Sequence, residues 1–245
     1  MEANQPAGYA IVVGASSGIG AEVTRQLAEK GWRVAAVARR ADRLERLAAE
    51  HPGRVIPVVH DVRDTGAVPE LFLKTTGELG GLDLIVYAAG VMPEVGWHEY
   101  NFEKDRLMVE VNLLGAIAWL NQAAIRFEGT RSGSIVAIGS VAGDRGRAGQ
   151  PVYNTTKAAL ATYMEALRNR LSRYGVRVVT IKPGPTATEM TAHLHLSGMM
   201  PAEKAAAKIV GLRNKTGEHY LKTTHRIAFA IIRRIPSFLF RKLKI

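Results

Sequence analysis

The stretch that decides the fold class of this chain is Tyr9-Ala-Ile-Val-Val-Gly14-Ala-Ser-Ser-Gly18-Ile-Gly20. Residues 9–13 form the kind of apolar run that is typical of a buried strand, and a Gly-rich turn follows it. Residues 21–30 then have helical character, and Gly31 ends them. Glycines between a strand and a helix let the backbone turn tightly and approach a pyrophosphate at the helix N-terminus. The stretch therefore predicts a phosphate-binding turn, with an ordinary Gly-rich turn as the alternative.

The spacing of Gly14, Gly18 and Gly20 is G-x-x-x-G-x-G. This spacing differs from the G-x-G-x-x-G of the best-known dinucleotide fingerprint, although the physical need is similar. A P-loop is excluded because no Lys-Ser or Lys-Thr pair follows the last glycine.

Outward from this turn, apolar runs alternate with helical stretches along the chain. We expect strands at residues 9–13, 33–38, 55–60, 82–88, 134–138 and 176–181. We expect helices at residues 21–30, 41–50, 102–127 and 151–174. Because the strands are apolar on both faces, the pattern favours a parallel sheet covered by helices on both sides. The predicted fold class is α/β, a single Rossmann-like doubly wound parallel sheet of about seven strands with a basic amphipathic C-terminal tail.

Length and composition exclude several classes of protein. The chain has 245 residues, 47% of them apolar and 22% charged, which excludes a disordered, collagen-like or coiled-coil protein. Cysteine is absent, so disulfides, thiolate metal sites and a cysteine nucleophile are excluded, and we expect no metal. We find no secretory signal in residues 1–8 and no apolar run near the roughly 18 residues of a membrane span. A cytoplasmic location is therefore expected.

The net charge of +11 is concentrated at the C-terminus. No acidic residue follows Glu218, and seven of the eleven charges come from the basic residues beyond it. These are Lys222, Arg226, Arg233, Arg234, Arg241, Lys242 and Lys244. We expect no nucleic-acid partner, because such a protein would spread basic residues over a face and add aromatic stacking platforms. We divide the chain into a catalytic domain, residues 1–225, and a basic amphipathic tail, residues 226–245.

A tyrosine and a lysine, Tyr153-x-x-x-Lys157, lie in the expected helix 151–174. The i, i+4 spacing puts both side chains on one face of the helix. A neighbouring ammonium favours the phenolate, so Lys157 is expected to lower the pKa of Tyr153 from its usual value of about 10. Such a tyrosine can act as a general acid or base near neutral pH. Taken alone, the pair is also typical of a solvated helix surface.

Two further polar residues point to the same site. Ser140 follows the expected strand 134–138, at the carboxyl edge where open α/β sheets bind ligands, and its hydroxyl can hold a substrate carbonyl oxygen. Asn112 lies in an otherwise apolar helical stretch, where a polar side chain needs partners. A satisfied core amide is the alternative interpretation of Asn112.

Together these residues resemble the short-chain dehydrogenase/reductase family in its compact branch. The resemblance spans roughly residues 8–190 and follows the family's order of motifs. The matching positions are Gly14, Gly18, Gly20, Asp61-Val62, Ala89-Gly90, Asn112, Ser140, Tyr153, Lys157 and Pro183-Gly184-x-x-x-Thr188. Two positions depart from the family: Val13 replaces a threonine, and Ala88 replaces an asparagine that usually ties neighbouring strands together. These departures concern local stability and leave the four catalytic positions intact.

The resemblance implies hydride transfer between a nicotinamide cofactor and a carbonyl or alcohol substrate. Tyr153 would give the proton to the carbonyl, while Lys157 would lower its pKa and bind the nicotinamide ribose. Ser140 would orient the substrate, and Asn112 would support a water-linked proton relay. A catalytically silent cofactor sensor or scaffold on the same fold is the competing function, against which the intact four-residue set argues.

The resemblance also implies a set of cofactor-binding residues. Asp61 and Val62 would contact the adenine, and Thr188 the nicotinamide end. Tyr153 and Lys157 would touch the cofactor as well. The remaining members are Gly14, Ser16, Ser17, Gly18, Ile19, Gly20, Arg39, Arg40, Ala89, Gly90, Pro183, Gly184 and Thr186.

The end of the expected strand 33–38 indicates which nicotinamide cofactor binds. NAD sites usually place an acid there to hold the ribose 2′-hydroxyl, whereas this chain has Ala38-Arg39-Arg40. An arginine fork can grip a 2′-phosphate, so the sequence favours NADP(H) over NAD(H). A solvated pair at a helix start is the alternative, and Asp42 is better placed to cap that helix.

Residues 186–200 are expected to form a lid over the active site. Its apolar members are Met190, Leu194, Leu196, Met199 and Met200. Methionine adapts to irregular apolar partners, so a bulky lipidic substrate is one interpretation and ordinary lid packing the other.

The tail departs from the family, whose usual ending, a short strand followed by Asp-Gly-Gly, is expected to be absent. Two short segments meet near Pro236, with apolar residues at every fourth position and basic residues between them. The apolar residues are Ile227, Ile231, Ile235, Leu239 and Leu243. The pattern suits peripheral contact with an anionic membrane, on its inner face, or docking on the body or on a partner subunit.

The tail, the lid and Ser140-x-Ala-Gly-x-Arg145 bear a weaker resemblance to the reductases of the decaprenylphosphoryl-arabinose epimerisation system. Those enzymes reduce a 2-keto pentose carried on a polyprenyl phosphate, which implies a lipid-linked carbonyl substrate in place of a free small molecule. Arg39 departs from a relative that uses only NADH. The family resemblance also implies a homodimer or a homotetramer.

Overall fold

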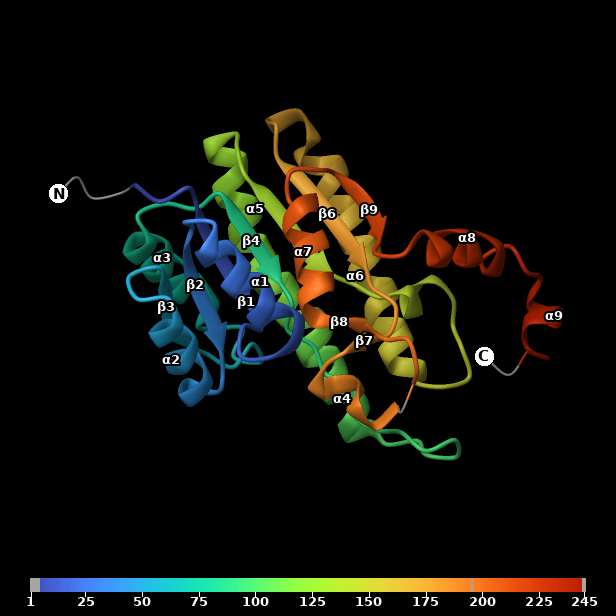
Figure 1. Cartoon of the computed structure of the whole chain (residues 1–245). Helices are drawn as coiled ribbons and strands as arrows, with labels where there is room; N and C mark the ends of the chain where they lie inside the picture. Colours follow the sequence, from blue (N-terminus) through green and yellow to red (C-terminus); the bar gives the residue numbers. More distant parts are fainter. Residues whose placement is uncertain (1–4, 195, 244–245) are drawn as a thin grey trace.

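A seven-stranded sheet forms the centre of the protein (Figure 1). The computed structural model describes residues 5–194 and 196–243. The strand order is β3-β2-β1-β4-β5-β6-β9, and every pairing is parallel. The strands are β1 (Tyr9–Val13), β2 (Arg33–Ala38), β3 (Val55–Val59), β4 (Leu84–Tyr87), β5 (Ser134–Ile138), β6 (Arg177–Lys182) and β9 (Gly217–Tyr220).

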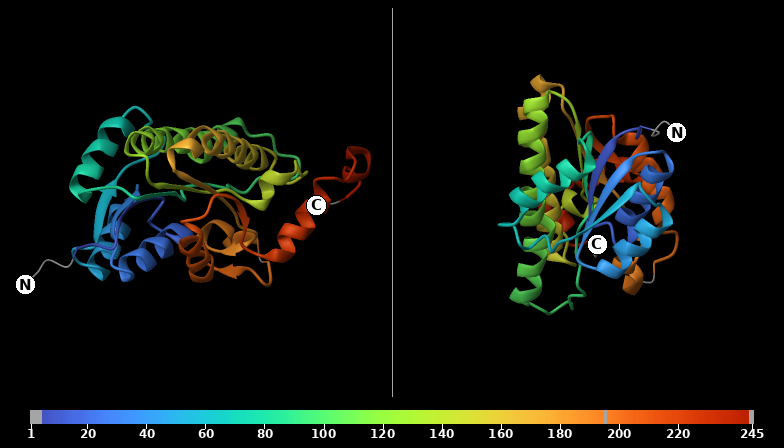
Figure 2. Two further views of the ribbon diagram at one scale, coloured as in Figure 1. Left: turned by 90° about the horizontal axis from the view of Figure 1, so that it is seen from above. Right: turned by 90° about the vertical axis from the view of Figure 1, so that its left-hand side faces the viewer.

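Helices cover both faces of this sheet (Figure 2). One face carries α3 (Val68–Leu79), α5 (Gly115–Thr130) and α6 (Pro151–Leu171), and the other carries α1 (Gly18–Glu29), α2 (Ala41–Glu50) and α7 (Ala202–Leu212). Side chains alternate along a strand, so Ile11 and Val13 pack on the first face while Ala10 and Val12 pack on the second. Burial on both faces explains why the inner strands are continuous apolar runs.

The predicted α/β class with a doubly wound parallel sheet of about seven strands is confirmed, and the predicted strands 9–13, 33–38 and 134–138 have the observed bounds. The prediction that a closing short strand is absent is wrong. Strand β9 pairs with β6, with Gly217 opposite Val179. The sequence Gly-Glu-His-Tyr of β9 has no apolar pattern because β9 is an edge strand whose side chains are not buried. Of the family's usual ending, a short strand followed by Asp-Gly-Gly, the chain has the strand and lacks the Asp-Gly-Gly motif.

The predicted helix 102–127 consists of α4 (Phe102–Val109), a π-helical turn (Glu110–Leu114) and α5. Asn112 lies in the π-helical turn, an irregularity that is frequent at functional sites. The stretch Phe102–Thr130 is long and apolar enough, by length and composition, to cross a membrane, which corrects the expectation that no such run exists. Half of its most apolar window is buried, and Trp119 packs fully buried against the sheet, as in a core helix.

The lid and the tail follow β6. The lid contains β7 (Thr186–Ala187), a 3₁₀ helix (Glu189–Leu194) and β8 (Met200–Pro201), and β7 pairs with β8. After β9, α8 (Thr223–Ile232) and α9 (Ser237–Phe240) extend away from the sheet (Figures 1 and 2). The tail residue Lys244 lies outside the described residues.

Candidate active site

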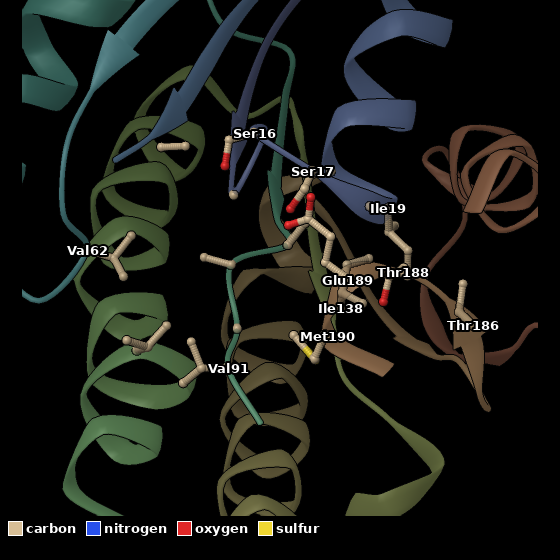
Figure 3. A pocket seen from close by; sticks show the side chains of 18 of the residues that line it. Ser16, Ser17, Ile19, Val62, Val91, Ile138, Thr186, Thr188, Glu189 and Met190 are labelled. Atoms are coloured by element: carbon tan, nitrogen blue, oxygen red, sulfur yellow. The ribbon is translucent and has the colours of Figure 1, made fainter. Parts of the chain in front are cut away.

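A pocket opens at the carboxyl ends of β1 to β6, the edge where open α/β sheets bind ligands (Figure 3). Every predicted site residue except Asn112 lines this pocket. The structure therefore brings together residues from six different strand ends, as the motif order predicts. Within residues 5–194 and 196–243, no group of three His, Asp or Glu side chains is placed to hold a metal ion.

The turn between β1 and α1 requires glycine. Gly14 has a φ of 93° and Gly18 a φ of 53°, a region that favours glycine. A Cβ on Gly14 would lie 2.4 Å from the backbone nitrogen of Ala89, and a Cβ on Gly20 would lie 2.2 Å from the carbonyl oxygen of Gly14. The glycines therefore allow the start of α1 to pack directly against the ends of β1 and β4.

The start of α1 is suited to bind an anion. Its first turn carries no acidic residue, and the N-cap residue Ser17 makes no side-chain capping bond within the described part of the chain. Free backbone N–H groups and the positive end of the helix dipole both favour a phosphate at such a position. The pyrophosphate of a nicotinamide dinucleotide fits this arrangement. Figure 3 shows the side chains of Ser16 and Ser17 on this turn, at the wall of the pocket.

Arg40 connects this turn to the lid. Its guanidinium donates to the hydroxyl oxygens of Ser16 at 2.9 Å and Ser17 at 2.7 Å, and pairs with Glu189 at 3.0 Å. Arg43 pairs with the other carboxylate oxygen of Glu189. Hydrogen bonds from Arg43 and Arg40 lower the pKa of Glu189, which therefore stays ionised. Glu189 links the lid to α2 across the mouth of the pocket.

Arg39 lies beside Arg40 on the same side of the pocket. Its side chain is 57% exposed, and its guanidinium is 3.9 Å from the carboxylate of Asp61. The Arg63 side chain forms closer hydrogen bonds with Asp61 and lowers the pKa of that carboxyl group. Arg39 is therefore only loosely held, and Arg39 and Arg40 offer two guanidinium groups to a phosphate at the end of β2.

Tyr153 and Ser140 both line the pocket, and their side chains interact. Ser140 Oγ accepts a hydrogen bond from the backbone N–H of Ala142 at 3.0 Å, which fixes the position of the hydroxyl. Burial raises the pKa of Tyr153, whereas the Ser140 side chain and the positive charge of Arg147 act in the lowering direction. The phenol is thus held as a proton donor beside a hydroxyl that can orient a carbonyl oxygen.

Lys157 does not lower the pKa of Tyr153 in this structure, contrary to expectation. Its Nζ donates to the carbonyl oxygen of Ile138 at 3.0 Å and lies 5.7 Å from the centroid of the Tyr153 ring. Burial lowers the pKa of Lys157 itself to about 8. The physical reason is that desolvation acts on both groups, favouring the neutral phenol and the neutral amine.

Lys157 gives the stability of the protein a pH dependence. Its pKa is about 8 in the folded chain, against about 10.4 in an unfolded chain, so between these values the unfolded chain binds more protons. The free energy of unfolding therefore rises with pH, and the gain is lost again as the pH falls through the folded pKa. We expect wild type to gain about 2 kcal/mol over Lys157→Met between pH 7 and pH 10. Urea unfolding of both proteins at pH 7 and pH 10 measures these free energies. An equal rise of the free energy of unfolding in wild type and Lys157→Met would contradict the role of Lys157.

Asn112 lies behind the pocket. It is fully buried, its Oδ1 accepts from the backbone N–H of Val91 at 2.7 Å, and its Nδ2 donates to the Val91 carbonyl at 3.0 Å and to Thr156 Oγ1 at 3.3 Å. These bonds fit the alternative interpretation of a satisfied core amide. Asn112 therefore ties the segment after β4 to α6, and in this way positions the helix that carries Tyr153 and Lys157.

The departures from the family motif leave the neighbouring strands tied together. The backbone N–H of Ala88 donates to the carbonyl of Val13 at 2.8 Å. Tyr87 adds a bond of its own, because its hydroxyl donates to the carbonyl of Val111 at 2.6 Å. The π-helical turn is thus held to β4 by the side chain of Tyr87.

The pocket also includes residues that the sequence analysis did not select. These are Ala38, His60, Ala88, Val91, Val111, Ile138, Gly139, Glu189, Met190 and Thr191. Most adjoin a motif residue, so adjacency is the signal that identifies them; His60, for example, precedes Asp61. Burial lowers the pKa of His60, whose ring meets Trp119 edge to face with 5.6 Å between centroids. Neutral His60 therefore supports the pocket wall.

Comparisons with known proteins agree with this geometry. A family model described as short chain dehydrogenase matches residues 8–197. An uncharacterized oxidoreductase of Myxococcus xanthus is 39% identical over 186 residues, which are 75% of this chain and 74% of the relative. A short-chain dehydrogenase from Streptomyces avermitilis is 25% identical, with a TM-score of 0.83 over 92% of each chain. A short chain dehydrogenase from Burkholderia cenocepacia, solved in complex with NADP, is 22% identical, with a TM-score of 0.83 over 97% of this chain and 98% of that one.

Proposed function

The chain belongs to the short-chain dehydrogenase/reductase family, and from this premise we propose that it is an NADP(H)-preferring reductase of carbonyl compounds. The family supports a nicotinamide-dependent oxidoreductase in general. One observation carries the proposal for this chain: Ser140, Tyr153 and Lys157 line the same pocket as the glycine turn.

The residues of the chain handle the proton and the orientation of the substrate. A bound nicotinamide supplies or accepts the hydride. As the alcohol forms, Tyr153 Oη gives its proton to the substrate oxygen, and Ser140 Oγ holds that oxygen in place. The phenolate left behind is stabilised by the Ser140 side chain and by the positive charge of Arg147. Oxidation of an alcohol uses the same groups in reverse.

The preference for NADP(H) rests on charge. Arg39 and Arg40 stand at the end of β2, where an enzyme that prefers NAD usually has an acid. A 2′-phosphate would compete with Glu189 for the hydrogen bonds that the Arg40 guanidinium donates. The complex of the Burkholderia cenocepacia dehydrogenase with NADP supports the same choice at the level of the fold.

The substrate that we favour is a carbonyl compound on an apolar carrier, of which a lipid-linked keto sugar is one case. Met190 extends from the lid into the pocket (Figure 3). Its Cε lies 3.7 Å from the position that a Cβ on Gly90 would occupy. Val91 and Val111 continue this apolar wall. An apolar wall next to a polar proton donor suits a substrate whose carbonyl is polar and whose remainder is not.

Thermal-shift titrations with NADPH and NADH, run side by side, test the proposal. A ligand at 100 times its Kd stabilises a protein by about 2.7 kcal/mol, or roughly 5–10 °C for a domain of this size. We expect NADPH to give this shift at concentrations at least about tenfold lower than NADH. In turnover assays, long-chain carbonyl substrates should then outperform short-chain ones.

The titration separates the parts of the proposal. A preference for NADH would keep the oxidoreductase and reject the role of the two arginines. No shift with either cofactor would reject the enzyme on this fold. A shift with NADPH but no turnover of any carbonyl compound would favour the silent cofactor sensor.

A further inference from the structure

The chain ends in an arm, residues 222–243, that extends beyond the sheet (Figures 1 and 2). The arm contains α8 and α9, and Pro236 is the N-cap residue of α9. It belongs to neither face of the sheet core, since the two core clusters contain no residue beyond Leu221 among those described. The exposed side chains of the arm are therefore available for a partner outside this chain.

The arm is anchored beside the active site. A Cβ on Gly184, which lines the pocket, would lie 2.0 Å from the ring of His225 in the first turn of α8. Arg145, from the segment that follows Ser140, donates to the carbonyl of Arg233 at 3.0 Å and lies 4.5 Å over the Phe240 ring. The base of the arm is thus held by the loops that form the pocket.

A buried acid strengthens this anchor. Asp144 accepts from Lys182 Nζ at 2.7 Å and from the Tyr220 hydroxyl at 2.6 Å, and Arg233 lies 3.7 Å from it. Arg233 also donates to the Tyr220 hydroxyl. Arg233 is therefore paired within the protein, and Lys222 Nζ donates to the carbonyl of Gly198 at 3.1 Å. The remaining basic residues of the arm that the structure describes are exposed.

The outer side of the arm is apolar. Ile227 is 60% exposed and Ile231, one turn later, is 62% exposed. Phe238, Leu239 and Leu243 continue this exposed set into the second segment. Scattered exposed apolar residues are ordinary, but a set that follows one element marks an interaction surface.

Basic residues flank this apolar side. Arg226, Arg234, Arg241 and Lys242 are exposed, and no acidic residue follows Glu218 in the whole sequence. The remainder of the chain also has a positive net charge, since the basic residues beyond Glu218 supply seven of the eleven net charges. The rest of a second copy of this chain would therefore offer the arm no net negative charge. Charge complementarity requires an anionic partner, and the adjacent apolar side chains require one with an apolar interior.

We propose that the arm binds the surface of a lipid bilayer that contains anionic headgroups. Ile227, Ile231 and Phe238 would enter the boundary between headgroups and acyl chains, and Arg226 and Arg234 would contact the headgroups. Because the arm is anchored on the loops around Gly184 and Ser140, this contact would hold the pocket near the membrane. A substrate with a lipid carrier could then reach Tyr153 without entering water.

A second exposed segment supports the same surface. The loop before α4 carries Trp97 and Tyr100, which are 69% and 95% exposed, and Phe102, the first residue of α4, is 74% exposed. This loop and the arm extend from the same end of the molecule (Figures 1 and 2). Tryptophan and tyrosine side chains favour the interface between membrane and water, because each combines an apolar ring with a polar N–H or O–H group.

Co-sedimentation of the full chain with vesicles tests the proposal. One set of vesicles contains phosphatidylglycerol and phosphatidylcholine in equal parts, and the other contains phosphatidylcholine alone. We expect binding to the first set only, weakening as salt is added. Ile227→Asp/Ile231→Asp should lower the partition coefficient at least about tenfold. Arg226→Gln/Arg234→Gln should lower it about 25-fold, since each basic residue contributes about fivefold.

Leu73→Asp is the matched control, because Leu73 is exposed to a similar degree on α3, away from the arm. This variant should bind the anionic vesicles like wild type. Retained thermal shifts with NADPH show that each variant is folded, so a failure of this proposal is distinct from a failure of the proposed function. Trp97 emission should shift to the blue on binding; bound protein with unchanged emission would overturn the placement of the aromatic loop.

Three results would overturn the proposal. The first is a wild-type chain that ignores both kinds of vesicle. The second is equal binding to both kinds, which would leave the basic residues without a role. The third is a loss of self-association in the Ile227→Asp/Ile231→Asp variant without any vesicle binding by wild type, which would assign the arm to a second copy of the chain.

Discussion

Tyr153→Phe is expected to lower kcat for carbonyl reduction by about 10³-fold, because the variant lacks the phenol that gives a proton to the substrate oxygen. The aromatic ring remains, so its position 5.7 Å from Lys157 Nζ is retained. An interaction made only in the transition state changes kcat more than the binding of ligands, so the Kd for NADPH should change by less than about threefold. Steady-state kinetics and an NADPH titration on the same preparations measure both quantities.

Tyr163→Phe is the matched control for this substitution. Tyr163 lies on the same helix, but its hydroxyl donates to Asn121 at 2.8 Å, outside the pocket. Its removal should leave kcat within about twofold of wild type, since substitutions away from the site have small effects. A Tyr153→Phe protein with the kcat of wild type would show that another group donates the proton. Equal losses in the two variants would indicate damage to α6 in place of lost chemistry.

The sequence predicts the centre of the fold well because that part is governed by burial. Strands such as β1 and β2 are buried on both faces, so their apolar runs are unbroken and their bounds are clear. The site residues are equally accessible to prediction. Apart from Asn112 and the pair Tyr153 and Lys157, which lie on helical segments, they lie just after the strands. The carboxyl ends of parallel strands meet at one edge, so the chain order of the motifs already places these residues together.

The same reasoning fails where tertiary contacts decide. Helix α3 begins with Val68-Pro69 and contains Gly77, so its local pattern is weak, and it is stabilised by Phe72 and Leu79 in the core. Strand β9 is polar and depends on its ladder with β6. The π-helical turn at Asn112 cannot be read from an apolar stretch, because it depends on the bonds of Asn112 to Val91 and Thr156.

Two properties of the site also lie beyond the sequence. Glu189 and Arg40 are 149 positions apart, and only the folded lid brings them together. The shift in the pKa of Tyr153 depends on how deeply the phenol is buried, and burial outweighs the nearby cations. A spacing of four residues predicts that Tyr153 and Lys157 are neighbours, but it does not predict how much water surrounds them.

Arg39→Ala/Arg40→Ala is expected to raise the Kd for NADPH about 100-fold and to leave the Kd for NADH within about threefold of wild type. Each arginine can donate charge-assisted bonds to a 2′-phosphate, a group that NADH lacks. Arg39 is the more available of the two, since its nearest acidic partner is Asp61 at 3.9 Å. Arg40 must exchange Glu189 for the phosphate, so Arg39→Ala alone should account for the larger part of the loss. Fluorescence titration with both cofactors gives the ratio of affinities.

Arg46→Ala controls for the removal of positive charge as such. Arg46 is also an exposed arginine of the α2 region, and it pairs with Asp42 within its own helix. Its loss should leave the ratio of NADPH to NADH affinity unchanged, because a surface ion pair of this kind contributes little. If Arg39→Ala/Arg40→Ala raises the Kd of both cofactors by the same factor, the arginines act by shaping the turn through Ser16 and Ser17. If the substitutions change neither Kd, the charge at the end of β2 does not select the cofactor, and the preference for NADP(H) loses its physical basis.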